Sequence, residues 1–181
     1  MWNWLIRNRL AAFEKKFGYD ASYMREVLEI DTGAFLAFAK VAKISRWRRD
    51  VPREAHYAAK LVGTMAEDCG PCTQLNVTMA LMEGADPKTL AAVIAGDEAA
   101  MTPDVLLAVK FARAALAHDP AADTLREDVV KRWGPRGLLS LALGLTGARM
   151  YPTLKYALGH GKTCQRILVA GTPVHAVRSA A

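Results

Sequence analysis

Two short segments in the middle of the chain each place a helix-capping side chain directly before a proline. These pairs are Asp86-Pro87 and Thr102-Pro103, and each precedes an apolar stretch with helical spacing. Asp and Thr can satisfy the free N–H groups at a helix start, and proline suits the first turn because its missing N–H would have no partner there. Alternating β-branched runs and Asn-Gly or Asp-Gly hairpin turns are absent from the sequence. The sequence therefore predicts an all-α fold of about eight or nine helices.

The length of 181 residues is enough for a single domain with a sizeable core. Hydrophobic residues make up 52% of the chain but aromatic residues only 8%, so alanine, leucine and valine supply most of the apolar content, which favours helices. Neither a tandem repeat nor a long linker divides the sequence. We predict one domain over residues 1–181, in which the residues from Gly171 onward form an extended or disordered arm.

Apolar residues near the start of the chain recur at steps of three or four, with cations at other positions. They are Trp2, Ile6, Leu10, Phe13 and Phe17. This spacing predicts an amphipathic helix that ends at Gly18. Such a helix resembles an interfacial membrane anchor, but its apolar stripe more often docks on the protein body, which is the interpretation we favour. Further helices are expected around residues 23–30 and 34–44.

The charge pattern and the cysteine count bear on partners and compartment. The net charge is +6, and between Lys40 and Arg53 six cations accompany one anion. We interpret this segment as a solvated loop rather than a surface for nucleic acid or anionic membrane, because no nucleic-acid-binding motif occurs. The best apolar run, 138–148, is too short to span a bilayer, and a secretory pattern is missing. Three cysteines, an odd number, fit a reducing cytoplasm.

The segment 67–76, Glu-Asp-Cys-Gly-Pro-Cys-Thr-Gln-Leu-Asn, contains two of the three cysteines. Cys69 and Cys72 are separated by two residues, so they can form a small disulfide ring or bind one metal ion together. Pro71 predicts that a helix begins within the motif, and its positive end favours a thiolate. Glu67 and Asp68 act in the opposite direction. The sequence leaves open which effect is larger.

Three elements follow one another around this motif: a helix, a Cys-x-x-Cys pair that enters a second apolar helix, and a Gly-Ala-Asp-Pro turn into a third. This order resembles the core of the alkylhydroperoxidase D-like proteins, in the carboxymuconolactone decarboxylase superfamily. The resemblance covers about residues 53–111. It implies an all-α subunit that forms a trimer or a dimer of trimers, and thiol-dependent hydroperoxide reduction. We expect a small hydroperoxide or disulfide as substrate and an external dithiol or protein as reductant. By position, Cys72 would be the peroxidatic cysteine and Cys69 the resolving one. We expect no cofactor and no metal.

Two positions depart from the pattern of these proteins. Those proteins carry a histidine four residues after the second cysteine, where this chain has Asn76. They carry a glutamate twelve residues before the first cysteine, where this chain has Tyr57. Asn76 can form hydrogen bonds but cannot act as a base, and tyrosine is a poor base at neutral pH. Other candidates for the proton relay lie nearby in the sequence: Glu54, His56, Glu67 and Asp68.

The leading hypothesis is therefore a thiol oxidoreductase, and three alternatives remain open. The cysteines can be inert core residues, since cysteine is often buried. The chain can be a non-catalytic oligomeric or membrane-peripheral interaction protein on the same scaffold. Zinc binding by Cys69 and Cys72 would need two further ligands, for which His160 with Cys164, or His56, are the candidates. Cys164 can alternatively act as an additional redox partner.

Overall fold

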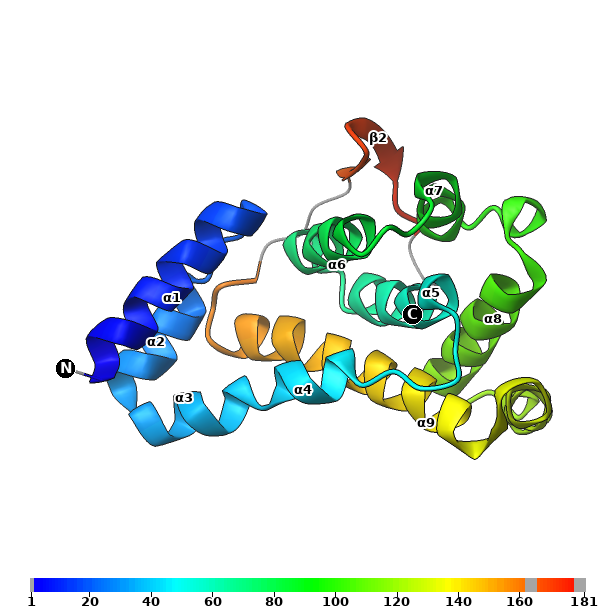
Figure 1. Cartoon of the computed structure of the whole chain (residues 1–181), viewed down its shortest axis with the longest axis horizontal. Coiled ribbons are helices and arrows are strands. Elements are labelled where there is room, and N and C mark those ends of the chain that lie inside the picture. Colours follow the sequence, from blue (N-terminus) through cyan, green and yellow to red (C-terminus); the bar gives the residue numbers. More distant parts are fainter. Residues whose placement is uncertain (1, 162–165, 178–181) are drawn as a thin grey trace.

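The computed structural model describes residues 2–161 and 166–177, and it confirms the all-α expectation. The helices are α1 (Trp2–Phe17), α2 (Ser22–Ile30), α3 (Thr32–Ala39), α4 (Val41–Arg46), α5 (Arg53–Ala66), α6 (Gly70–Met82), α7 (Pro87–Ala95), the short 3₁₀ helix η1 (Glu98–Ala100), α8 (Pro103–Ala117) and α9 (Ala121–Ala157). A small sheet follows, with strands β1 (Arg166–Val169) and β2 (Thr172–His175). Figure 1 shows α1–α3 at one end of the molecule and α5–α8 at the other, with α9 extending between them.

Helices α5–α8 and the middle of α9 form the body of the molecule around an apolar core. We call this the body core; its fully buried members include Leu61, Val77, Leu90, Ile94, Val105, Val109 and Leu141. Both predicted helix starts are confirmed within it. The Asp86 carboxylate accepts the Thr89 backbone N–H at 2.8 Å, and the Thr102 hydroxyl accepts that of Val105 at 3.4 Å. These caps fix where α7 and α8 begin.

The sequence predicts a helix break at Gly134-Pro135, and helix α9 changes direction sharply there. Gly134 has φ 70° and ψ 178°, a backbone conformation that only glycine adopts without strain, and Pro135 follows it. The segments before and after Gly134 run in clearly different directions (Figure 1). Pro152 lies inside the second segment without ending it, and the helix continues to Ala157.

Helices α1–α4 form an arm that packs on the body through a second buried cluster. This arm cluster consists of Tyr19, Ala21, Tyr23, Met24, Leu28, Phe35, Cys69 and Cys72. Ile6, Leu10, Phe13 and Phe17 pack against it, so the apolar stripe of α1 docks on the protein. Among the described residues, none of the helices is both long enough and apolar enough to cross a membrane.

The single helix expected over residues 34–44 is divided into α3 and α4 at Lys40. The backbone N–H of Lys40 donates to the Ala37 carbonyl, and that of Lys43 donates to Lys40. These are contacts between residues three apart, which tighten the chain and redirect it between the two helices. The expectation of one continuous helix was wrong because α3 and α4 face different parts of the molecule.

The C-terminal segment contains a β-hairpin rather than only an extended or disordered arm. β1 pairs with β2 in antiparallel register, with Val169 opposite Thr172. Ala170 and Gly171 both have positive φ, 48° and 83°, as the tight turn of a two-residue hairpin requires. Ala-Gly is a weak signal for this turn, so the sequence did not predict it. The side-chain amide of Gln74 anchors β1 to α6 by donating to the Leu168 carbonyl and accepting its N–H.

Candidate functional site

The two motif cysteines lie at the start of α6, at the boundary between the body and the arm. Cys69 is the residue immediately before the helix, Pro71 occupies its first turn, and Cys72 follows within that turn. Both thiols are free and nearly in contact, and their residues are only 1% and 3% exposed. The predicted helix start within the motif is therefore confirmed, and it brings the two sulfur atoms together.

Residues of the arm cover the thiols. The Tyr19 hydroxyl lies 3.5 Å from the Cys72 Sγ, a contact in which either group can donate. The same hydroxyl donates to the Tyr23 hydroxyl at 3.3 Å. Both tyrosines are buried, and burial raises the pKa of each phenol well above its usual range. The tyrosines therefore stay protonated and form a neutral hydrogen-bonding wall over the sulfur atoms.

A buried cation completes the surroundings of the thiols. Lys155 of α9 is 2% exposed, and its Nζ lies 4.8 Å from the ring centroid of Tyr19 and 5.3 Å from that of Tyr23. Ammonium groups are attracted to aromatic faces, most strongly when they are removed from water. The positive charge of Lys155 favours thiolate formation at both Cys69 and Cys72.

The two thiols share their protons unequally. Interaction with the Cys72 thiol as a hydrogen-bond donor lowers the pKa of Cys69 to about 7, against the opposing effect of burial. The Cys72 backbone amide and Lys155 lower it further, whereas Asp68 raises it. The same pairing, together with burial, raises the pKa of Cys72. Cys69 is therefore the thiol that ionises first, and Cys72 keeps its proton.

The proton-relay candidates from the sequence are distributed around the site, and only Asn76 bonds directly to the motif cysteines. Its amide donates to the Cys72 carbonyl at 3.0 Å. The Glu67 carboxylate accepts from Arg149 Nε at 2.6 Å, and the Asp68 carbonyl accepts from Tyr156 at 3.0 Å. The negative charge of Asp68 raises the pKa of Cys69 and so opposes formation of its thiolate.

Two further candidates on α5 have partners away from the sulfur atoms. The Tyr57 hydroxyl donates to Glu83 at 2.7 Å. His56 donates through Nε2 to the Ser45 carbonyl at 3.2 Å, and burial lowers its pKa to about 4, so its ring is neutral. Its Nδ1 is buried without a hydrogen-bond partner among the described residues. Neither residue is brought to the thiols.

Sequence reasoning missed the groups that surround the thiols: Tyr19, which contacts Cys72, and Tyr23 and Lys155, which pack on Tyr19. The two tyrosines lie four residues apart around the start of α2, and Lys155 is a lone cation beside apolar residues of α9. Both are weak signals, because nothing in the sequence indicates that such distant segments pack around the cysteines.

The candidate zinc ligands do not gather around the cysteines among the described residues. His160 bonds instead to residues of α2, with Ser22 at its Nδ1 and Glu26 at its Nε2. The described residues contain no group of three or more His, Cys, Asp or Glu side chains arranged to hold a metal ion. Cys164 lies outside the described residues.

A cavity of about 330 Å³ lies next to the thiol pair, between the arm and the body. Three residues around the thiols also line this cavity: Tyr19, Tyr23 and Asn76. Its other walls are mainly apolar side chains of α1, α3, α6 and α9, with the cations Lys60 and Arg46 among them. A small molecule in this cavity would be separated from the sulfur atoms by little more than the tyrosine wall.

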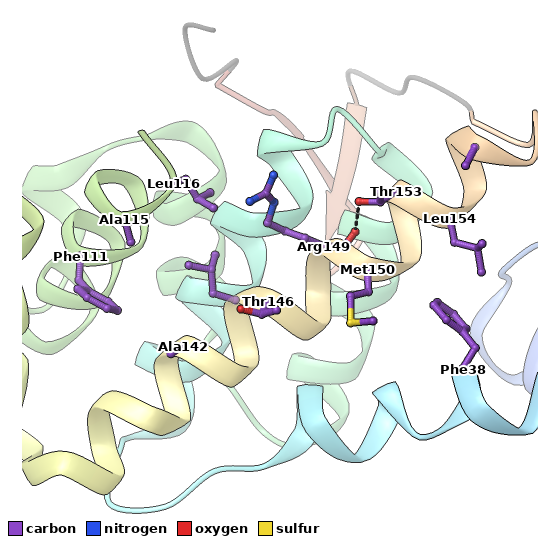
Figure 2. Close-up of a pocket in the computed structure, with 12 residues that line it drawn as sticks. Phe38, Phe111, Ala115, Leu116, Ala142, Thr146, Arg149, Met150, Thr153 and Leu154 are labelled. Atoms are coloured by element: carbon purple, nitrogen blue, oxygen red, sulfur yellow. Dashed lines mark hydrogen bonds between the residues drawn. The ribbon is translucent and has the colours of Figure 1, made fainter. Parts of the chain in front are cut away.

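A larger groove of about 620 Å³ follows a different face of α9 and does not involve the cysteines. Figure 2 shows Phe38 from α3 at one end and Phe111 from α8 at the other, with Thr146 and Met150 along α9 between them. Arg149 also lines the groove, but its guanidinium is paired with Glu67. The groove offers apolar surface rather than reactive groups.

A scan against protein-family models finds no match for this chain, and searches of curated proteins and of solved structures find none either. The likeness to alkylhydroperoxidase D-like proteins therefore rests on the motif residues and their helical setting.

Proposed function

We propose that the chain is a thiol oxidoreductase in which Cys69 and Cys72 cycle between a dithiol and a disulfide. The observation that carries the proposal is the pairing of two free thiols at a helix start, where the pKa of Cys69 is lowered to about 7. A lowered pKa makes the thiolate of Cys69 available near neutral pH, and the thiolate is the nucleophile in both hydroperoxide and disulfide chemistry.

The reaction with a hydroperoxide proceeds in two steps. The Cys69 thiolate attacks one oxygen of ROOH, the O–O bond breaks, and RO⁻ takes up a proton from solvent and leaves as ROH, so that Cys69 becomes a sulfenic acid. The Cys72 thiol then attacks the Cys69 sulfur, a disulfide forms and water leaves. An external dithiol or protein reductant returns two electrons and two protons. With a disulfide substrate, the first step forms a mixed disulfide instead.

The roles of the two cysteines in this proposal are the reverse of those that the family resemblance implies. That resemblance assigns the attack to Cys72, whereas the electrostatics favour the thiolate at Cys69 because Cys72 and Lys155 both stabilise it. The protonated Tyr19 beside Cys72 is placed to hold the resolving thiol. A cytoplasmic compartment, which would supply the reductant, is part of the proposal.

The test is to treat the fully reduced protein with a small hydroperoxide and to follow intact mass and peptide maps. We expect rapid loss of two hydrogens, mapped to a Cys69–Cys72 link and retained in the matched control Cys164→Ala. Oxidation no faster than that of free cysteine, or a link that involves Cys164 instead, would contradict the proposal.

Single-cysteine variants separate the two roles. In Cys72→Ala, the sulfenic acid on Cys69 has no resolving thiol, so a sulfenic-acid trap such as dimedone should label Cys69. In Cys69→Ala, we expect little labelling of Cys72, since burial still raises the pKa of its thiol. Strong labelling of Cys72 and none of Cys69 would restore the roles that the resemblance implies.

A second candidate function is a homo-oligomeric scaffold, which the groove along α9 favours. Met150 in this groove is 38% exposed, and its neighbours are mainly apolar. Exposed apolar surface of this kind often marks a protein interface. We propose that a second copy of the chain covers it, in a trimer or a dimer of trimers. Light scattering should then give a mass above that of one chain, which Met150→Asp lowers; a monomer in both proteins would exclude this role.

A further inference from the structure

We infer that the cavity between the arm and the body binds a small amphipathic carboxylate, with the acid group at Lys60 and the apolar chain along the aromatic walls. The inference rests on a buried cation that no carboxylate of the described residues contacts directly. Binding of such a ligand does not depend on the thiols. Reduction of a peroxide bond carried by such a ligand, with Cys69 and Cys72 oxidised to the disulfide, would rest on the function proposed above.

Lys60 is the residue that identifies the ligand as an anion. It lies on α5 and is 2% exposed, yet it lines the cavity. Its Nζ lies 4.6 Å from the ring centroid of Tyr57. Among the described residues, none accepts a hydrogen bond from this ammonium, and no carboxylate lies within 4.0 Å of it, although an ammonium can donate three hydrogen bonds. Buried charges are normally paired, so an incoming anion would supply what is missing.

The charged groups around Lys60 leave this position open to an anion. Glu83 favours the charged form of Lys60, but its carboxylate accepts the Tyr57 hydroxyl and is exposed at the end of α6. Arg46 of α4 also lines the cavity and adds a second positive charge. Its Nε donates to the Ala42 carbonyl, which leaves the rest of its guanidinium for a second contact. The local balance therefore favours a carboxylate over a neutral or cationic group.

The remaining walls determine the rest of the ligand. They are mainly apolar or aromatic and include Leu10, Phe13, Met24, Phe35, Leu75 and Met79. A cavity of about 330 Å³ is at the lower end of the range for small-molecule sites. If each non-hydrogen group takes about as much space as one water, about 30 Å³, roughly a dozen such groups would fit. Decanoate has this size and chemistry.

The test measures binding of three probes of equal length to the reduced protein by calorimetry: decanoate, the neutral decanamide and the cationic decylamine. We expect decanoate to bind at least tenfold more tightly than decanamide and decylamine to bind most weakly. Lys60→Met should weaken decanoate binding tenfold or more and leave decanamide unchanged, which also shows that the variant is folded. The matched control Lys88→Met, an exposed lysine of α7, should bind all three as the wild type does.

A variant that fills the cavity provides a second test that does not depend on charge. Met79→Trp should abolish binding of decanoate and decanamide alike. The inference is overturned if the wild type binds neither ligand, if it binds decanamide as tightly as decanoate, or if Lys60→Met leaves decanoate binding unchanged. Loss of peroxide reactivity with intact decanoate binding would refute the proposed function alone.

Discussion

The body core and the arm cluster are both buried, but they are built from different chemistry. The body core consists mainly of alanine, leucine, valine and isoleucine side chains, with few polar atoms. The arm cluster contains two cysteines and two tyrosines and lies against the ammonium of Lys155. Apolar packing stabilises a fold without needing specific polar partners, whereas each buried polar group must be matched. The difference indicates that the body supports the fold and that the arm cluster is where chemistry can occur.

The largest effect should come from a deletion in the body core. Leu61→Ala removes a fully buried side chain of α5 and should lower the free energy of unfolding by about 3 kcal/mol. Leu28→Ala, in the arm cluster, removes a side chain that is equally hidden at 2% exposure. We expect Leu28→Ala to raise the alkylation rate of the cysteines under native conditions, because the arm can open locally. We expect it to lower the free energy of unfolding less than Leu61→Ala does. Denaturant unfolding and timed alkylation measure the two effects; equal behaviour of the variants would remove the distinction between the regions.

Lys60→Met should stabilise the protein at neutral pH, by about 1–3 kcal/mol, since it removes a buried and unpaired charge. Burial lowers the pKa of Lys60 from 10.5 to about 8, against the effect of Glu83 and together with that of Arg46; Tyr57 and the neutral His56 are its other titratable neighbours. Between these pKa values the unfolded chain binds the proton more tightly, so wild-type stability should rise with pH from about 8 to 10.5.

The variant should lack this rise, which denaturant titrations at several pH values can measure. A loss of stability in Lys60→Met at neutral pH would instead mean that the lysine has a structural partner.

Removing the hydrogen-bond donor of the thiol pair should have the next largest effect. In Cys72→Ala the pKa of Cys69 should rise above 7, and each unit of increase lowers its thiolate fraction near neutral pH up to tenfold. The pH dependence of iodoacetamide alkylation, read by mass spectrometry of the Cys69 peptide, measures the shift. An unchanged profile would mean that the helix start and Lys155 alone set the pKa.

The smallest effect is expected from the tyrosine wall. Tyr19→Phe deletes the hydroxyl 3.5 Å from the Cys72 sulfur but keeps the ring that contacts Lys155. Stability should change by about 1 kcal/mol or less. The rate of disulfide closure after oxidation of Cys69 should change several-fold, because the resolving thiol loses its hydrogen-bonding partner. Tyr23→Phe, whose hydroxyl contacts only Tyr19 among these groups, is the matched control and should affect closure less.

The sequence was sufficient for the fold where local chemistry determines structure. The caps at Asp86 and Thr102, the break at Gly134 and the helix start at Pro71 all act over a few residues, and all were predicted. The division of the helix at Lys40 and the Ala170-Gly171 hairpin were not, because they depend on packing or on a weak turn signal. The thiol pair could be identified from its spacing, but Tyr19 and Lys155 come from distant segments that only the tertiary fold brings together.

The most direct test of the central claim is a pH titration of thiolate absorbance in the reduced protein and in its Cys69→Ala and Cys72→Ala variants. The account predicts a single ionisation near pH 7 in the wild type, its absence in Cys69→Ala, and its displacement to higher pH in Cys72→Ala. A wild-type protein whose thiols ionise only above pH 9 would contradict the claim and leave the cysteines as inert residues of the arm cluster.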